Sequence, residues 1–165
     1  MALKGDRYEG MTDISFFMND SSAAKGGVVV LSTVGSGVAL DQSKALVTYA
    51  GTASGNVPVG LLLNDMVNID QTRQHINFHK NEVQKGGKVT LLTQGWVVTD
   101  MITGTPTAGA PAYLTDDGKL TPTQSATGGV VATPPVGRFL SSKDEDDYAK
   151  VAINLPALPN NANGN

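Results

Sequence analysis

Cysteine is absent from this sequence. The 165 residues contain none, which excludes a disulfide framework, a thiolate metal site and a cysteine nucleophile. Because a chain without thiols suits both oxidising and reducing surroundings, the cysteine count does not indicate a compartment. A chain of this length is nevertheless long enough for one domain that is stabilised by its hydrophobic core alone.

Charged residues are scarce. They make up only 16% of the chain, and the formal net charge is −3. A nucleic-acid-binding domain normally carries a strongly basic face, so we expect no nucleic-acid partner. Much of the polar surface must instead come from Ser, Thr, Asn and Gln, which are suited to flat and hydrated contact surfaces.

Long apolar runs are also missing. No stretch approaches the roughly 18 apolar residues of a membrane-spanning helix. The first ten residues, MALKGDRYEG, lack the apolar region of a secretory signal peptide. We therefore expect a soluble protein with no membrane partner, made in the cytoplasm and not exported by the general route.

Helical periodicity is missing as well. No window carries apolar residues at positions i, i+3, i+4 and i+7 over three turns. Short β-branched segments separated by Gly and Pro predict strands instead. The predicted strands cover residues 28–34, 44–50, 57–63, 75–79, 88–98, 111–115, 134–140 and 148–155. The expected fold class is therefore all-β.

One hairpin can be predicted in detail. Asp117 and Gly118 supply the positive φ angles that a tight turn between two strands requires. Tyr113 and Leu114 should then pair in antiparallel fashion with residues 119–121.

Two phrases occur twice in the same order. Lys-Gly-Gly at residues 25–27 and 85–87 precedes a Val-rich strand each time, and Pro-Val-Gly follows at residues 58–60 and 135–137. We expect the Gly-Gly turn to lead into a strand, and the Gly of Pro-Val-Gly to mark a bulge or a close backbone approach. The order indicates an internal duplication, with two similar β halves in one barrel or sandwich. Chance repetition of turn-plus-valine phrases is the alternative.

The ends of the chain differ from its middle. Residues 1–22 mix charge with apolar side chains and predict an extended N-terminal arm, whereas residues 156–165, PALPNNANGN, predict a flexible tail. The β domain would span residues 23–155. Adjacent side chains of an extended chain point to opposite faces, so Phe16 and Phe17 predict an arm that runs between two surfaces.

Motifs for catalysis and cofactor binding are not found. GDRYEGMT resembles the start of a phosphate-binding loop, but Met11 stands where the lysine belongs. GSGVAL begins like a dinucleotide-binding turn, but Leu40 replaces its third glycine. There is no G-x-S-x-G sequence and no evident pair of carboxylates for acid–base chemistry. We expect no enzyme activity, no catalytic residue and no cofactor.

Metal-binding patterns fail on spacing. His75 and His79 alternate within a predicted strand, which would place them about 13 Å apart, too far to share one ion. The acidic turn, residues 144–147 of KDEDDY, lacks the central glycine of a calcium loop. We expect a solvated turn there, with a weak cation site or a contact to a basic partner patch as alternatives, and no metal. Trp96, the only tryptophan, is consistent with either a core or an interface residue.

Several of these phrases are similar to those of one known family. AGAPAYLTDDGKLTP, PPVGRFLSSKDEDDYAKVAINLP, KGGVVVLS and VPVGLLL resemble small capsid decoration (cement) proteins of tailed bacteriophages. The resemblance covers roughly residues 23–156. It does not extend to the acidic turn, to the Asn-rich tail or, except loosely, to residues 1–22.

The resemblance implies a compact β-barrel or β-tulip domain that forms a homotrimer on the outside of the virion. Such a protein would bind the major capsid protein at three-fold or quasi-three-fold positions, bridge adjacent subunits and stabilise the expanded shell. We expect Trp96 to contribute to trimer packing and the arm to contact the capsid. The arm residues proposed for that contact are Arg7, Tyr8, Met11, Ile14, Phe16 and Phe17. Deletion of residues 1–20 is then expected to leave a folded trimer that no longer binds heads.

Two other functions compete with this interpretation. A carbohydrate- or receptor-binding module of a phage fibre would need a platform of exposed aromatic side chains, and the chain has one Trp and four Tyr. A small trimeric β enzyme of the nucleotide-hydrolase type would need a phosphate- or metal-binding loop, which the motif search does not find.

Overall fold

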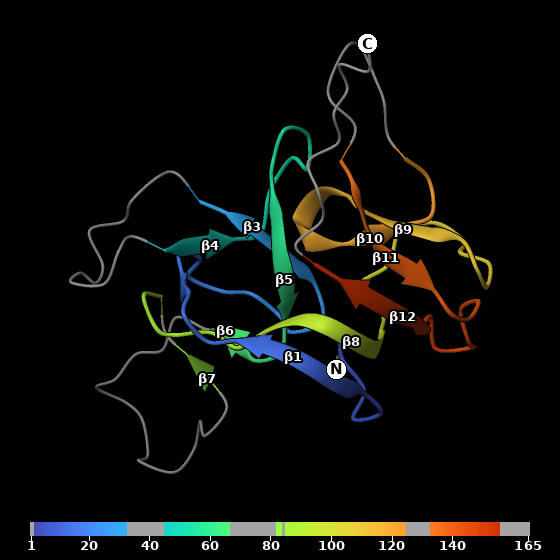
Figure 1. The fold of residues 1–165 in the computed structure, drawn as a ribbon, viewed down its shortest axis with the longest axis horizontal. Helices are drawn as coiled ribbons and strands as arrows, with labels where there is room; N and C mark the ends of the chain where they lie inside the picture. Colours follow the sequence, from blue (N-terminus) through green and yellow to red (C-terminus); the bar gives the residue numbers. More distant parts are fainter. Residues whose placement is uncertain (1, 33–44, 67–81, 84, 125–132, 156–165) are drawn as a thin grey trace.

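The computed structural model describes residues 2–32, 45–66, 82–83, 85–124 and 133–155 (Figure 1). Strands dominate these residues, and the all-β prediction is confirmed. The only helical element in the described ranges is one 3-10 turn, η1 (Asp116–Gly118). The strands are β1 (Tyr8–Asp13), β2 (Phe17–Met18), β3 (Val28–Leu31), β4 (Leu46–Thr48), β5 (Pro58–Leu62), β6 (Asp65–Met66), β7 (Glu82–Val83), β8 (Leu91–Thr99), β9 (Pro111–Leu114), β10 (Leu120–Thr121), β11 (Pro135–Phe139) and β12 (Ala149–Asn154).

Ten strands form one sheet. Its order is β10-β9-β11-β12-β8-β5-β3-β4-β2, and β1 pairs with β8 outside this path. A second, two-stranded sheet joins β6 to β7 in parallel. Because β10 and β2 end the path without pairing with each other, the large sheet is not a closed barrel. The prediction of a compact β domain is confirmed, and the prediction of barrel closure is corrected.

The sheet divides at β8. β1 pairs along β8 from Leu91 to Trp96. The opposite edge of β8 is shared by two strands, since β5 pairs with Leu91 and Leu92 while β12 pairs with residues 94–99. From β8, the part of the sheet that begins with β5 and the part that begins with β12 run in different directions (Figure 1).

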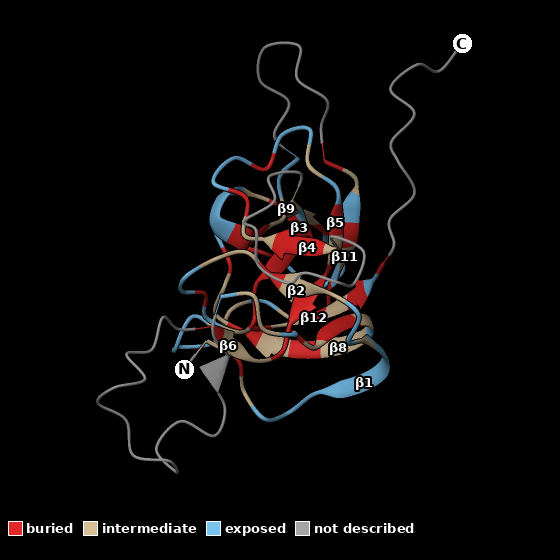
Figure 2. Cartoon of the chain, turned by 90° about the vertical axis from the view of Figure 1, so that its left-hand side faces the viewer, coloured by how far each residue is buried: buried red, intermediate tan, exposed pale blue. Residues whose placement is uncertain are grey.

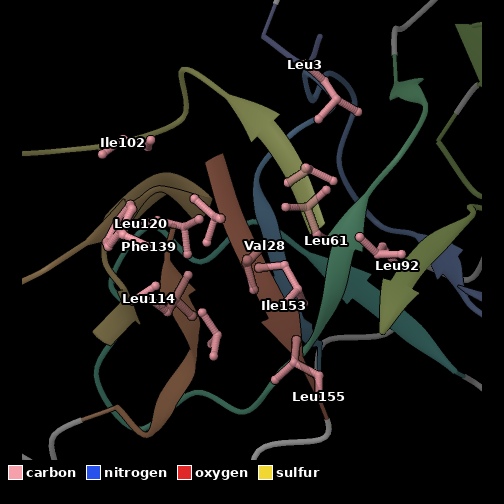
Figure 3. Close-up of a cluster of buried hydrophobic side chains, with 14 of the residues drawn as sticks. Leu3, Val28, Leu61, Leu92, Ile102, Leu114, Leu120, Phe139, Ile153 and Leu155 are labelled. Carbon is pink, nitrogen blue, oxygen red and sulfur yellow. The ribbon is translucent and has the colours of Figure 1, made fainter. Parts of the chain in front are cut away.

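Two hydrophobic cores lie on opposite faces of the β3–β5 region. Val28 and Leu61 belong to the larger core, which Figure 3 shows, whereas Val29 and Leu62 belong to the smaller one. Successive side chains of a strand point to opposite faces. A strand covered on both faces therefore needs an uninterrupted apolar run, and this explains the Val-Val-Val of β3.

The predicted hairpin is present. Leu120 pairs with Leu114 and Thr121 with Tyr113. Asp117 and Gly118 have φ angles of 58° and 73°, so both residues occupy the left-handed region as predicted.

The repeated phrases have the predicted local structure. Gly26 and Gly86 have positive φ angles in the turns before β3 and before the β8 segment. A Cβ atom on Gly60 would lie 2.8 Å from the Leu91 Cβ atom, and one on Gly137 would lie 1.8 Å from the Ala152 carbonyl oxygen. The close backbone approach is confirmed. The two halves differ in pairing, however, because β3 and β5 are neighbours while β12 separates β8 from β11.

Candidate interaction surface

The N-terminal segment, residues 2–18, lies along one edge of β8 as far as Asp13. Leu3 forms a bridge with Thr99, and the Lys4 amide donates to the Val98 carbonyl oxygen at 2.9 Å. β1 continues along the same strand, from the Tyr8–Trp96 pair to the pair of Asp13 and Leu91. The segment then reaches β2, which pairs in parallel with β4.

Both ends of this segment are buried. Leu3 is 2% exposed and Met18 is fully buried, and they belong to the larger and smaller cores respectively. The Thr99 hydroxyl lies 2.8 Å from the Ala2 carbonyl oxygen and 2.9 Å from that of Gly26, so β8 also holds the chain at residue 2. Deletion of residues 1–20 would therefore remove core side chains together with candidate contacts. Point substitutions are needed to separate the two effects.

The acidic turn also holds the N-terminal segment. The Lys4 ammonium lies 2.8 Å from Asp144 Oδ2 and 4.2 Å from the centroid of the Tyr148 ring. This hydrogen bond raises the pKa of Lys4 and lowers the pKa of Asp144. Asp144 Oδ1 accepts hydrogen bonds from the backbone amides of Asp146 and Tyr148, which fixes the shape of the turn. The turn is exposed, as predicted for residues 144–147.

Between its buried ends, the segment is exposed. Five of the six β1 residues are exposed and the sixth is half-buried, so β1 lies on the outside of the molecule (Figure 2). Tyr8 is 58% exposed, Met11 57%, and Ile14, just beyond the strand, 61%. Among the described residues no strand pairs with the other edge of β1. Three large apolar side chains on β1 and just beyond it therefore face solvent on a segment that the fold holds in place.

The remaining arm candidates lie elsewhere. Arg7 is exposed and its guanidinium forms an ion pair with Glu9. Phe16 packs against the smaller core, and the Lys88 ammonium lies 5.6 Å from the centroid of the half-buried Phe17 ring. The structure thus groups Tyr8 with Met11 and Ile14, and separates them from Phe16 and Phe17. Capsid contact by all six residues stays a prediction.

Trp96 lies on the outer face of the sheet. Tyr8 is its neighbour on β1 and Ala152 its neighbour on β12. The indole is half-buried and belongs to neither core, and the Lys150 ammonium lies 3.6 Å from its ring centroid. The inner face of the same strands is occupied by buried side chains, among them Val97, Val151 and Ile153.

The residues that extend this face were not predicted from the sequence. Arg138 pairs with Ala152, which pairs with Trp96, so one row crosses β11, β12, β8 and β1. Beside this row a shallow hollow of about 300 Å³ is lined by Pro135, Gly137, Arg138, Ala152 and Asn154. The alternation of PPVGRFL and YAKVAINL already carried this signal, because its outward positions include Arg138, Lys150 and Asn154.

The described residues were also searched for metal sites and for membrane-spanning helices. In the ranges that the structure describes, no group of three or more His, Asp or Glu side chains is placed to hold a metal ion. Those ranges also contain no helix long and apolar enough to cross a membrane. His75, His79, the strand predicted at residues 75–79 and the tail predicted at residues 156–165 fall outside the described residues.

Comparison with protein families identifies a match. The model for the structural cement proteins of phages, described by E217 gp24 and Pam3 gp6, matches residues 6–154. The chain belongs to this family. The match includes the exposed β1 strand, the row through Trp96 and the acidic turn, and it confirms the resemblance noted in the sequence. A search of the curated proteins gave no match.

Membership of this family establishes the general function of the chain. The chain is a structural cement protein of a phage capsid, so its partners are capsid components and its place is the virion. A structural role is consistent with the prediction that the protein is not an enzyme.

Proposed function

We propose that this cement protein binds the outside of a tailed-phage head and stabilises the expanded shell by bridging adjacent major capsid subunits. It acts as a homotrimer at three-fold or quasi-three-fold positions. The observation that carries the proposal is β1, which presents exposed Tyr8 and Met11 and leads to Ile14 while both ends of its segment are buried.

The fixed position of β1 favours binding. Exposed apolar side chains are common on protein surfaces when they occur singly. Three within seven residues, two on β1 and one directly after it, offer a partner several apolar contacts close together in the chain. Because the segment is ordered before binding, less conformational entropy is lost when the capsid covers it. Because these side chains are already partly buried, covering the exposed remainder of each would contribute roughly 1–2 kcal/mol.

A bridging protein stabilises a lattice through mass action. If the contact surface exists only on the expanded shell, each bound copy lowers the free energy of that state relative to any other. Three contacts on one trimer raise the effective concentration of each, so the individual contacts need not be strong.

The test uses expanded heads that lack the protein. A triple variant, Tyr8→Ser, Met11→Ser and Ile14→Ser, is compared with wild type for binding to these heads by cosedimentation. We expect its affinity to fall by about 100-fold, because three apolar contacts of roughly 1 kcal/mol each are lost. The matched control is Val57→Ser with Leu31→Ser, which changes side chains that are 54% and 43% exposed and lie outside both the N-terminal segment and the β11–β12 hairpin.

Binding by the control should stay within threefold of wild type. Circular dichroism checks that both variants fold. Equal affinity of the triple variant and the control would contradict the role of β1. A reconstruction of decorated heads then tests position and stoichiometry, and density away from the three-fold positions would contradict the proposed placement.

A further inference from the structure

The outer face of the sheet is the strongest remaining surface. One row of directly paired residues, Arg138, Ala152, Trp96 and Tyr8, crosses four strands. The inner face of these strands packs on the larger core. In the described part of the chain, the side chains of this row belong to neither hydrophobic core, and no strand of the second sheet pairs with these four strands. A half-buried indole beside a shallow hollow is the kind of centre that protein interfaces use.

The end of this face formed by β11 and β12 is positively charged. Arg138 is exposed and forms no ion pair with any described residue. The Lys150 ammonium lies over the Trp96 ring instead of beside a carboxylate. The other outward side chains of β8 and β12 are uncharged, as the list Gln94, Val98, Ala152 and Asn154 shows. The whole chain carries a net charge of −3, so this basic area contrasts with the rest of the surface.

The acidic turn between β11 and β12 complements this charge. Asp144 pairs with Lys4, and Asp147 lies 3.4 Å from the Lys143 ammonium. Glu145 and Asp146 are exposed, and neither forms an ion pair within the described part of the chain. The hydrogen bonds to Asp144 Oδ1 hold the turn in one shape. Two carboxylates therefore project on a fixed loop without an ion pair among the described residues, although the charge of Asp146 also acts on Lys4, which pairs with Asp144.

We propose that, in the homotrimer, the acidic turn of one copy docks on the Trp96 face of the next copy. Glu145 and Asp146 then pair with Arg138 and Lys150 of the neighbour. This inference rests on the proposed function because it names the interface of the proposed trimer. Within one chain the turn and the face do not form these ion pairs, although β11 and β12 carry both. A contact between two different patches is heterologous, and such contacts close into rings of three when the rotation is 120°.

A charge-reversal experiment tests this interface. The first variant reverses the face, Arg138→Glu with Lys150→Glu, and the second reverses the turn, Glu145→Lys with Asp146→Lys. The third combines all four substitutions. The trimer–monomer equilibrium is measured by sedimentation equilibrium over a range of protein and salt concentrations. We expect each reversal alone to weaken assembly at least about tenfold, and the combined variant to recover most of the loss.

The control reverses two exposed lysines away from the face, Lys85→Glu with Lys119→Glu, and should leave assembly unchanged. Thermal unfolding by circular dichroism checks that every variant folds, and the recovery in the combined variant separates pairing from simple misfolding. The interface is refuted if both charge reversals leave the trimer–monomer equilibrium unchanged. It is also refuted if the combined variant assembles no more tightly than the two single reversals.

The outcomes also separate this inference from the proposed function. A wild-type protein that stays monomeric at every concentration refutes the proposed trimer, and this interface with it. A trimer that survives reversal of the face, but binds heads less tightly, assigns the face to the capsid and overturns the contact between copies.

Discussion

Gly137 shows, at the scale of a single residue, how a missing side chain lets two strands approach each other. A Cβ atom there would lie 1.8 Å from the Ala152 carbonyl oxygen, and the pairing of β11 with β9 shifts next to it. We expect Gly137→Ala to lower the free energy of unfolding by at least the 1–3 kcal/mol typical of overpacked sites. Chemical denaturation measures this loss. The matched control is Gly51→Ala, whose new Cβ atom would meet nothing within 4 Å, and an equal loss in both variants would contradict the explanation.

Tyr49 is a second residue whose surroundings make a prediction. Its hydroxyl donates to the Ala24 carbonyl oxygen and accepts a hydrogen bond from the Gly27 amide at 3.2 Å. Burial raises the pKa of Tyr49 above the ordinary tyrosine value of about 10. The unfolded chain therefore loses this proton at a lower pH than the folded protein does. The contribution to stability is complete below about pH 10 and is lost as the pH rises above it.

Tyr49→Phe should change stability in two ways. Near neutral pH, loss of the two hydrogen bonds should cost about 1–3 kcal/mol, because the Ala24 and Gly27 groups lose a partner. Above about pH 10 the variant should lose stability less steeply than wild type. Denaturant titrations at a series of pH values measure both effects. Tyr8→Phe, at an exposed ring, is the control, and parallel pH profiles of wild type and Tyr49→Phe would refute the assignment.

At the scale of elements, the N-terminal segment is part of the sheet that it borders. Leu3 and Met18 hold its ends in the two cores while β1 between them stays exposed. We expect Leu3→Ala to cost about 2–5 kcal/mol in the free energy of unfolding, as for other buried leucines. Leu31→Ala, at a side chain that is 43% exposed, should cost no more than about 0.5 kcal/mol. Urea midpoints compare the two variants. If Leu3→Ala left the free energy of unfolding unchanged, burial of Leu3 would not be what holds the N-terminal segment in place.

The strands themselves were largely predictable from the sequence. Seven strands fall within a predicted segment or overlap it, because β-branched runs between turn residues depend only on local sequence. They are β3, β4, β5, β8, β9, β11 and β12. The order of the strands was not predictable, since pairing joins residues far apart in the chain. Nothing local indicates that β8 carries β5 and β12 on one edge and β1 on the other. The predicted barrel failed at this point.

The candidate surface was predictable only in part. Met11 and Ile14 stand out in the sequence as apolar residues in a charged segment, and the structure leaves both exposed. Phe16 looked equivalent to them, but it packs against the smaller core. Its environment is set by β4 and by residues near Val89, whose amide donates to the Phe16 carbonyl oxygen at 3.1 Å. A contact of this range in sequence has no local signal.

At the scale of the whole molecule, the exposed strip on β1 and the row through Trp96 are parts of one outer surface. Tyr8 belongs to both, since it is exposed on β1 and pairs with Trp96. The β1 end carries the exposed apolar side chains of Tyr8 and Met11, and the β11–β12 end is basic with an acidic turn beside it. The proposed trimer needs one surface for the capsid and one for its own copies, and the two ends of this face provide chemically different contacts.

This division makes a prediction about affinity for the capsid. If three copies act as one clamp, a variant that no longer forms the trimer, such as Arg138→Glu with Lys150→Glu, still carries an intact β1. It should bind single sites on expanded heads but lose the gain from linkage, so its apparent affinity should fall by about 10²–10⁴-fold. Wild type at 100 times its dissociation constant should stabilise each site by about 2.7 kcal/mol, and the monomeric variant at the same concentration by far less. Thermal disruption of decorated heads, followed by release of DNA to an intercalating dye, measures this difference.

The variant with all four charges exchanged should restore the wild-type melting temperature, because it regains the trimer without any change to β1. A monomeric variant that protects heads as well as wild type would show that capsid binding does not depend on assembly, and each copy would then have to bridge two subunits by itself.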